Sequence, residues 1–204
     1  MAHKFLITTF ATIWNNFVTL FHLIDYRTLL ACLVLPIVLW PLIWTGFIRP
    51  TKQVLEITAV VITGLFTFGL IVRFALTRHL FLLWATGLMA IAMSREIHFS
   101  GSDEALLIGW PILLGVALWR YDVFMSYLEN PVLINLLAGG FLFYILSQTI
   151  DQRWWKGLPG EEVVFVPLEE LIEICGHCTV GFALLFSKQV RQSNNIPQGD
   201  ENHA

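Results

Sequence analysis

The sequence predicts an all-α fold, a polytopic membrane bundle of six transmembrane helices preceded by an N-terminal amphipathic helix. Several apolar runs approach the ~20 residues that a helix needs to cross a bilayer. Hydrophobic residues make up 56% of the 204 residues and charged residues only 13%, against about 25% charged in a typical soluble domain. The apolar runs and the low charge together indicate a membrane protein.

The charge and cysteine content argue against several classes of function. A net charge of −3 provides neither a polybasic tail for anionic lipids nor the basic surface of a nucleic-acid-binding protein, so we expect no nucleic-acid partner. The three cysteines all fall inside apolar segments and do not form a disulfide framework. The start of the chain lacks a short apolar core followed by a small-residue cleavage site, so we expect it to be retained.

Residues 1–27 form the first predicted unit, an amphipathic helix. Phe10, Trp14 and Phe17 recur at three- and four-residue spacing, while polar side chains such as Asn16 fall mostly on the opposite face. This pattern is typical of a helix that lies in the membrane interface. A seventh spanning helix is the alternative, because the segment is long enough and is uncharged over most of its length.

The bundle itself is predicted over residues 28–188, and the polar tail 189–204 is expected to be disordered. The loops between the apolar runs are so short that neighbouring helices must be antiparallel. Pro36 and Pro41 lie in the first span and predict a kink there. We expect the spans at residues 28–48, 54–76, 79–97, 104–120, 131–150 and 167–187.

Charged residues divide unevenly between the two expected faces of the bundle. Alternate helix ends must share a face, which places the loops 49–53, 95–104 and 151–166 together. With the adjoining helix ends, this face holds ten acidic and five basic residues, whereas the other face holds five acidic and seven basic residues. The excess of Lys and Arg favours a cytoplasmic position for the second face. We therefore expect the acid-rich face outside the cytoplasm.

The last predicted span carries the most unusual side chains of the chain. Glu169, Glu170, Glu173 and His177 fall within an arc of about 100° on one helix. Glu169 and Glu170 follow Pro167 in the first turn, where acidic residues commonly begin a helix. Glu173 and His177 lie one and two turns deeper, and ionisable groups inside a membrane span indicate a functional site.

The ends of the third and fifth spans supply candidate partners for this helix. On the same face lie Arg95, Glu96 and His98 from the third span and Ser147, Asp151 and Arg153 from the fifth. Carboxylates combined with imidazoles suit a divalent metal such as Zn or Fe. The candidate metal ligands are His98, Glu173 and His177, and the candidate catalytic residues are Glu173, Glu170, Asp151, Arg95 and Glu96.

Two further interpretations of these residues stay open. Without a metal, the same groups form either an Arg–carboxylate network that fixes the register of the helices or a path for protons or ions.

The sequence Cys175-Gly-His-Cys178 copies a dithiol redox motif, but it lies two to three turns inside an apolar helix, away from the groups that activate thiols. We interpret both cysteines as small packing residues.

Three short motifs carry a resemblance to known proteins. They are R-E-I-H-F at the end of the third span, D-Q-R-W-W after the fifth and L-E-E-L-I-E at the start of the sixth. These motifs resemble a group of uncharacterised bacterial inner-membrane proteins, which implies a multi-pass protein of the bacterial inner membrane and no particular activity. The Ser94-x-x-x-His98 spacing is similar to that of metal-dependent ceramidase-like hydrolases. Those enzymes use a further histidine pair in a late span, and only His177 stands here, so we do not assign the chain to them.

The sequence leaves three functions open. The first is a membrane enzyme in which a metal activates water and a glutamate acts as general base. The second is a non-catalytic accessory or assembly subunit with a membrane-protein partner or a second copy of itself, which suits a small chain with short loops. The third is a small proton-coupled carrier, although no internal repeat is evident. The lipid bilayer is the partner that the composition itself predicts.

Overall fold

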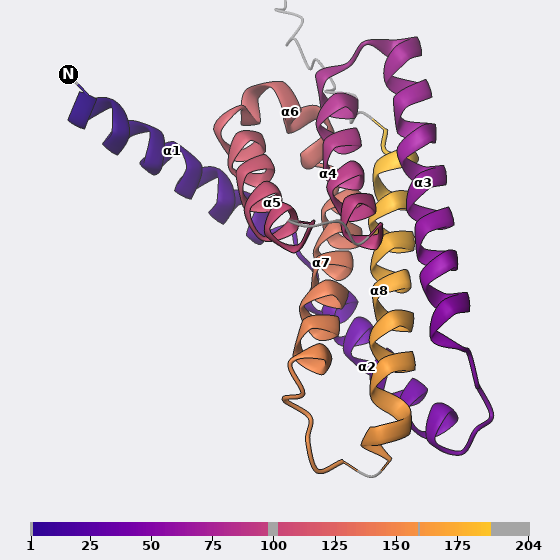
Figure 1. Ribbon diagram of the computed structural model, residues 1–204. Coiled ribbons are helices and arrows are strands. Elements are labelled where there is room, and N and C mark those ends of the chain that lie inside the picture. The colour runs from indigo at the N-terminus through magenta and orange to yellow at the C-terminus, as the bar shows by residue number, and fades with distance from the viewer. Residues whose placement is uncertain (1, 98–101, 159, 189–204) are drawn as a thin grey trace, which may run out of the picture.

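The computed structural model describes residues 2–97, 102–158 and 160–188. It describes the side chains of residues 8–97, 108–158 and 160–188. Within these residues the fold is entirely helical, as predicted (Figure 1). The helices are α1 (Ala2–Phe21), α2 (Tyr26–Trp44), α3 (Lys52–Thr77), α4 (Leu80–Glu96), α5 (Ser102–Trp119), α6 (Tyr121–Leu128), α7 (Pro131–Asp151) and α8 (Glu161–Leu185).

Short polar side chains begin several of these helices. The carboxylate of Asp25 accepts a hydrogen bond from a backbone N–H in the first turn of α2, and Thr51 does the same for α3. Asn130 caps α7, which continues with Pro131 at its first position. Such caps satisfy backbone N–H groups that have no partner inside the helix, so they fix where each apolar segment starts.

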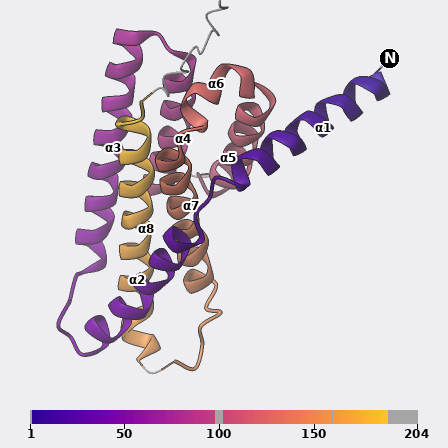
Figure 2. The same ribbon diagram turned by 180° about the vertical axis from the view of Figure 1, so that it is seen from behind.

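Helix α8 lies at the centre of the bundle and packs against α7, α3, α2 and α4 (Figure 1). Helix α1 extends away from the bundle and contacts α5, as both ribbon views show (Figure 2). The side-chain amide of Asn16 donates a hydrogen bond to the carbonyl oxygen of Leu118 at 2.8 Å, which attaches α1 to the end of α5. Phe10, Trp14 and Phe17 of α1 are exposed. Whether α1 lies in the interface or spans stays a prediction.

Fewer helices meet the requirements of a membrane span than the six predicted. In the described residues, α2, α3 and α7 are long and apolar enough to cross a bilayer, and a fourth span results if the bent pair α5–α6 crosses as one unit. Helix α4 has only 17 residues, and the middle of α8 contains Glu169, Glu170 and Glu173. The structure therefore supports a helical membrane protein with three or four such spans among the described residues. It does not support all six of the predicted spans.

Helix α4 stops at half the depth of the bundle. It begins at the α3–α4 connection, at the end of the molecule away from the α2–α3 and α7–α8 loops (Figure 1). Its last turn contacts Glu173, which is the midpoint of α8. At 1.5 Å per residue, α4 is about 25 Å long, against about 39 Å for α3. The sequence predicted that the end of the third span would share a face with the α2–α3 and α7–α8 loops. Instead, Arg95 and Glu96 lie inside the bundle.

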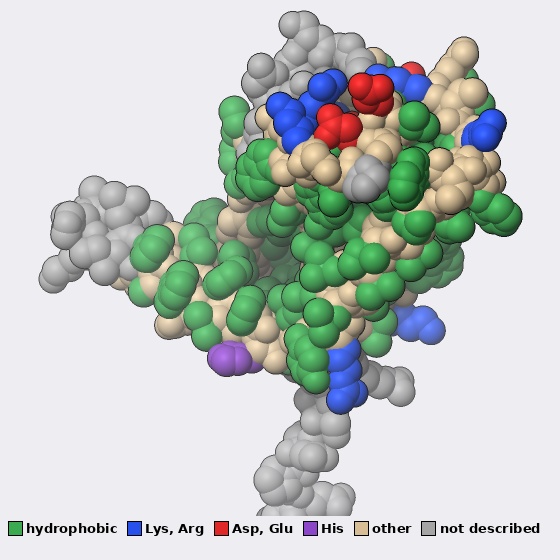
Figure 3. Space-filling model, turned by 90° about the horizontal axis from the view of Figure 1, so that it is seen from below, with side chains coloured by type: hydrophobic (Ala, Val, Ile, Leu, Met, Phe, Trp, Pro, Cys, Tyr) green, Lys and Arg blue, Asp and Glu red, His purple; other side chains and the backbone are tan. Residues whose placement is uncertain are grey.

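Two hydrophobic clusters fill the bundle on either side of this level. One contains residues of α3, α4, α6, the N-terminal half of α7 and the C-terminal half of α8, including Leu70, Phe81 and Leu184. The other contains residues of α2, the C-terminal half of α7 and the N-terminal half of α8, including Ile150 and Leu168. The end of the bundle that carries the α2–α3 and α7–α8 loops presents a patch of acidic and basic side chains, with hydrophobic side chains along the flanks (Figure 3). The tail 189–204 lies outside the described residues.

Candidate functional site

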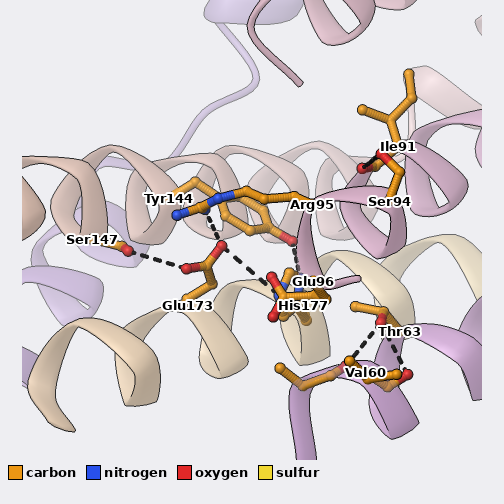
Figure 4. Close-up of polar contacts among 11 residues, drawn as sticks. Val60, Thr63, Ile91, Ser94, Arg95, Glu96, Tyr144, Ser147, Glu173 and His177 are labelled. Atoms are coloured by element: carbon orange, nitrogen blue, oxygen red, sulfur yellow. Dashed lines mark hydrogen bonds and ion pairs between the residues drawn. The ribbon is translucent and has the colours of Figure 1, made fainter. Parts of the chain in front are cut away.

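Six polar side chains from three helices meet between the two hydrophobic clusters, and we call them the polar cluster (Figure 4). They are Arg95 and Glu96 from α4, Tyr144 and Ser147 from α7, and Glu173 and His177 from α8. All are buried except Arg95, whose side chain is 15% exposed. Isolated charges are very costly at such depth, so their partners decide whether the arrangement is stable.

His177 has a partner at each ring nitrogen. Its Nδ1 lies 2.6 Å from the Tyr144 hydroxyl, and its Nε2 lies 3.1 Å from Oε1 of Glu96. A neutral imidazole satisfies both contacts when Tyr144 donates to Nδ1 and the Nε2–H donates to the carboxylate. The Tyr144 ring is itself fixed by an edge contact with Trp110, 4.6 Å between ring centroids.

Glu173 joins the other members of the cluster. Its Oε1 forms an ion pair with Nη1 of Arg95, and its Oε2 accepts a hydrogen bond from the Ser147 hydroxyl at 3.5 Å. The same Oε1 lies 4.0 Å from Nε2 of His177, one helical turn away. Figure 4 shows the Glu173 carboxylate between Ser147 and Arg95, with the imidazole to one side. The carboxylate of Glu173 therefore links α4, α7 and α8.

Small residues allow the helices to approach closely enough for these contacts. A Cβ on Gly176 would lie 3.3 Å from the Tyr144 ring and 3.4 Å from the carbonyl oxygen of Gly140. A Cβ on Gly140 would meet the Val180 side chain and would lie 3.3 Å from the Val180 backbone nitrogen. These glycines hold α7 against α8 directly beside the polar cluster.

The charges of the cluster do not cancel when the imidazole is neutral. If both carboxylates are ionised, the described side chains Glu96, Glu173 and Arg95 together carry one negative charge. One bound proton brings the net charge to zero, whereas a divalent metal ion brings it to plus one. Because a low-dielectric interior penalises net charge, this arrangement favours a proton over a divalent ion.

The cluster also contains a group of side chains able to hold a metal ion. Glu96, Glu173 and His177 each offer one ligand atom, and these atoms all lie within 4.8 Å of one another. Ligand distances of about 2.0–2.2 Å from a shared zinc ion require such atoms to be about 3.5 Å apart or closer. A metal would therefore have to draw the three side chains together and compete with Arg95 for Glu173.

The structure separates the predicted site residues into two groups. Arg95 and Glu96 contact Glu173 and His177 as part of the cluster. Asp151 is exposed and accepts a hydrogen bond from Gln152, and Glu170 is half-buried one turn from Glu173. The third predicted metal ligand, His98, lies outside the described residues. The roles assigned to these residues stay predictions.

Tyr144 is the member that the sequence pattern did not reveal. It lies seven residues before Asp151 and three before Ser147, so all three fall on one face of α7. That spacing is the signal that could have identified it. Without that spacing, a tyrosine in an apolar run is interpreted as a packing residue, because most of its surface is hydrophobic.

The two cysteines of the CGHC sequence, Cys175 and Cys178, are free thiols on either side of His177. Cys175 packs against the hydrophobic cluster that contains Ile150. Neither contacts the carboxylates of the polar cluster in any hydrogen bond or ion pair described here, which fits their interpretation as packing residues.

Comparisons with protein-family models, with curated proteins and with solved structures found no match to this chain. The function therefore has to follow from the residues of the site themselves.

Proposed function

We propose that this chain is a multi-pass protein of the bacterial inner membrane that binds and releases a proton at the polar cluster. In this proposal α8 crosses the bilayer despite its glutamates, because Arg95 and Ser147 bind Glu173 within the bundle. The acid-rich end of the bundle faces the outside of the cell, as the distribution of Lys and Arg suggests. The protein would then be an ion-handling protein, such as a proton-coupled carrier.

The observation that carries this proposal is the double partnership of His177. In the proton-free form, Tyr144 donates to Nδ1 and Nε2–H donates to Glu96. In the proton-bound form, Nδ1–H donates to the Tyr144 oxygen and Nε2–H again donates to Glu96. Both ring nitrogens keep their partners in either form, so only the Tyr144 hydroxyl has to turn. Histidine also titrates nearest to physiological pH among ordinary side chains.

Charged and titratable groups come from every helix packed against α8, and they set the cost of each form. They are Arg95 and Glu96 on α4, Tyr144 and Asp151 on α7, Glu169, Glu170, Glu173 and Cys178 on α8, Lys52 and Glu56 on α3, and Cys32 on α2. Acidic groups outnumber basic groups in this set.

The direct test follows the protonation of His177 by nitrogen NMR. Protein labelled with nitrogen-15 in its histidine rings is reconstituted into lipid nanodiscs, and the His177 signals are assigned by their loss in His177→Gln. As the pH is lowered across the range in which the protein stays folded, we expect them to move from a neutral ring to a doubly protonated ring. A ring that keeps one protonation state throughout this range overturns the proposal.

A metal-dependent enzyme is the second candidate, favoured by the grouping of Glu96, Glu173 and His177. In that case a divalent ion would activate water and a glutamate would act as general base. Elemental analysis of the purified protein tests it, because a resident metal should approach one equivalent and fall sharply in His177→Ala. Metal content well below one equivalent and equal in both proteins removes this candidate.

A further inference from the structure

Helices α4 and α5 form a hairpin that enters the bundle and turns back at half its depth (Figure 1). The indole N–H of Trp84 in α4 donates a hydrogen bond to the carbonyl oxygen of Leu113 at 2.7 Å, and the indole N–H of Trp110 in α5 donates to that of Leu88 at 3.2 Å. The residue numbers rise along one helix as they fall along the other, so the pair is antiparallel. Continuing this pairing places the start of α5 level with the end of α4.

The burial of one face of α8 changes at the level where the hairpin turns. This face is an arc of about 80° that follows the helix. Beside α4, its residues are at most 4% exposed; they are Glu173, His177, Val180 and Leu184. Toward the α2–α3 and α7–α8 loops, the same face holds Glu162, Val166 and Glu169, none of which is buried, and Val166 is 44% exposed.

The uncovered part of this face forms a groove in the side of the bundle, below the last turn of α4. Figure 1 shows α3, α7 and α8 continuing past that turn toward the loops. Both ribbon views place α2 on the other side of α7 and α8 (Figure 2). Among the described residues α2 therefore does not take the place of α4, and the groove follows α8 between α3 and α7.

The walls of the groove are polar. On α7, Phe141 packs edge-on against an indole ring of α5, 5.1 Å between ring centroids, and Gln148 lies two turns further along the same face. On α3, Lys52 lies two turns before the buried Ala59 on one face and forms an ion pair of 3.4 Å with Glu56. Together with the glutamates of α8, these side chains present amide, ammonium and carboxylate groups to the groove.

The groove leads from the loops to the polar cluster. Glu162 and Glu173 are eleven residues apart on α8, which corresponds to about 16 Å along the helix. The last turn of α4 closes the inner end of the groove. It carries Arg95, which is 15% exposed and is the one member of the polar cluster that is not buried. The groove and the polar cluster therefore meet at Arg95 and Glu173.

We infer that water rather than lipid fills this groove, so that aqueous solutes reach the polar cluster from the end of the bundle that carries the α2–α3 and α7–α8 loops. Lipid chains offer no partner to a carboxylate, an amide or an ammonium group, and an uncovered polar wall persists at membrane depth only where it meets water. The inference rests on the proposed function in placing α8 across the bilayer. It does not depend on whether the cluster binds a proton or a metal ion.

The test labels single cysteines with a permanently charged thiol reagent that does not cross membranes. Gln148→Cys places a thiol on the α7 wall at the depth of Glu173, because Gln148 directly follows Ser147, which binds Glu173. Glu169→Cys places a thiol on α8, one turn nearer the loops. The wild-type chain, with its three native cysteines, supplies the background rate.

Ile57→Cys on α3 is the matched control. Helices α3 and α8 run in the same direction with Phe66 beside Gly181 (Figure 1). Ile57, nine residues before Phe66, is therefore level with Ile172, the neighbour of Glu173. The Ile57 side chain is 56% exposed and points away from the buried side of α3, so a thiol there faces the bilayer.

We expect Gln148→Cys and Glu169→Cys to react at least about tenfold faster than Ile57→Cys, because a reactive thiolate forms in water and not in an apolar surrounding. Whole cells and inverted membrane vesicles expose opposite ends of the protein to the reagent. Lys156→Cys in the α7–α8 loop and Thr77→Cys at the end of α3, both at exposed positions, mark these ends. The groove thiols should react in the preparation in which Lys156→Cys reacts.

Groove thiols that react no faster than Ile57→Cys, because lipid or the helix of a partner occupies the groove, overturn the inference. Reaction only in the preparation that labels Thr77→Cys also overturns it. If one of the two groove variants does not fold, the other gives the same comparison. The titration of the His177 ring is a separate measurement, so failure of the labelling leaves the proposed function intact, and a ring that does not titrate leaves the groove intact.

Discussion

Glu173 and Glu96 are two buried carboxylates, and the guanidinium of Arg95 forms an ion pair with Glu173. The ion pair between Arg95 and Glu173 has side-chain exposures of 15% and 6%, so water screens it poorly. Removing the guanidinium takes away the ion-pair partner of Glu173 and leaves two carboxylates in the same buried volume with no described arginine between them. Loss of one partner from a buried pair is generally far more harmful than loss of both.

We therefore expect Arg95→Gln to destabilise the protein by about 3–5 kcal/mol, and the further change Glu173→Gln to restore most of that loss. The measurement is unfolding of each variant in mixed detergent micelles, analysed as a double-mutant cycle. The exposed pair Lys52–Glu56, 3.4 Å apart, is the matched control, and its coupling should be only about 0.3–0.5 kcal/mol. Similar couplings for the two pairs would contradict the buried charge assignment.

At the scale of single residues, the sequence predicted where to look more reliably than what would be found. Glu173 and His177 stood out because charged groups are rare in apolar helices, and the ends of the third and fifth spans were predicted to supply their partners. The structure brings Arg95, Glu96 and Ser147 to them. Tyr144 escaped detection because its single hydroxyl is hidden in an apolar residue, and contact with His177 depends on the packing of two helices.

At the scale of helices, periodicity predicted that the elements exist but not how deep they reach. Helix α4 has the apolar composition of a spanning helix, yet it stops beside the midpoint of α8. No pattern within its own residues specifies this depth, because the tertiary contact of Arg95 with Glu173 sets it. Conversely, α8 has the length of a span but carries glutamates whose partners lie on other helices.

The contact of α7 with α8 depends on Gly140, and a single methyl group should disturb it. A Cβ at this position meets the Val180 side chain and lies 3.3 Å from the Val180 backbone nitrogen. Backbone atoms cannot move aside as a flexible side chain can, so we expect Gly140→Ala to cost about 1–3 kcal/mol through overpacking. Thermal unfolding in detergent micelles measures the effect.

The same substitution at Gly115 of α5 is the control. Nothing lies within 4 Å of a Cβ at that position, so Gly115→Ala should stabilise the helix by up to about 1 kcal/mol. Equal effects at the two glycines would mean that α7 and α8 do not depend on close contact. In Gly140→Ala the 2.6 Å contact of Tyr144 with His177 should also loosen, and the His177 ring signals would report this.

At the scale of the molecule, a layer of polar side chains divides the hydrophobic core. Phe143 and Ile172 belong to the cluster on one side of the layer, and Leu137 and Val180 to the cluster on the other. A continuous apolar core would bury the same helices without the cost of desolvating charges. The layer must therefore serve either a function of its own or the choice of helix register.

Replacing the whole layer by apolar side chains separates these two explanations. The variant is Arg95→Met, Glu96→Leu, Tyr144→Phe, Ser147→Ala, Glu173→Leu and His177→Leu. Because well-packed apolar residues can replace a buried ionic group without loss, we expect this protein to be at least as stable as the wild type and to keep its helix content. Thermal unfolding and circular dichroism measure both properties.

A uniquely folded, equally stable variant that has lost its function shows that the polar layer is retained for function and not for stability. A variant that unfolds at lower temperature or adopts several helix registers assigns the layer to register. That outcome favours an accessory or assembly subunit, which purification with its partner in mild detergent would then identify.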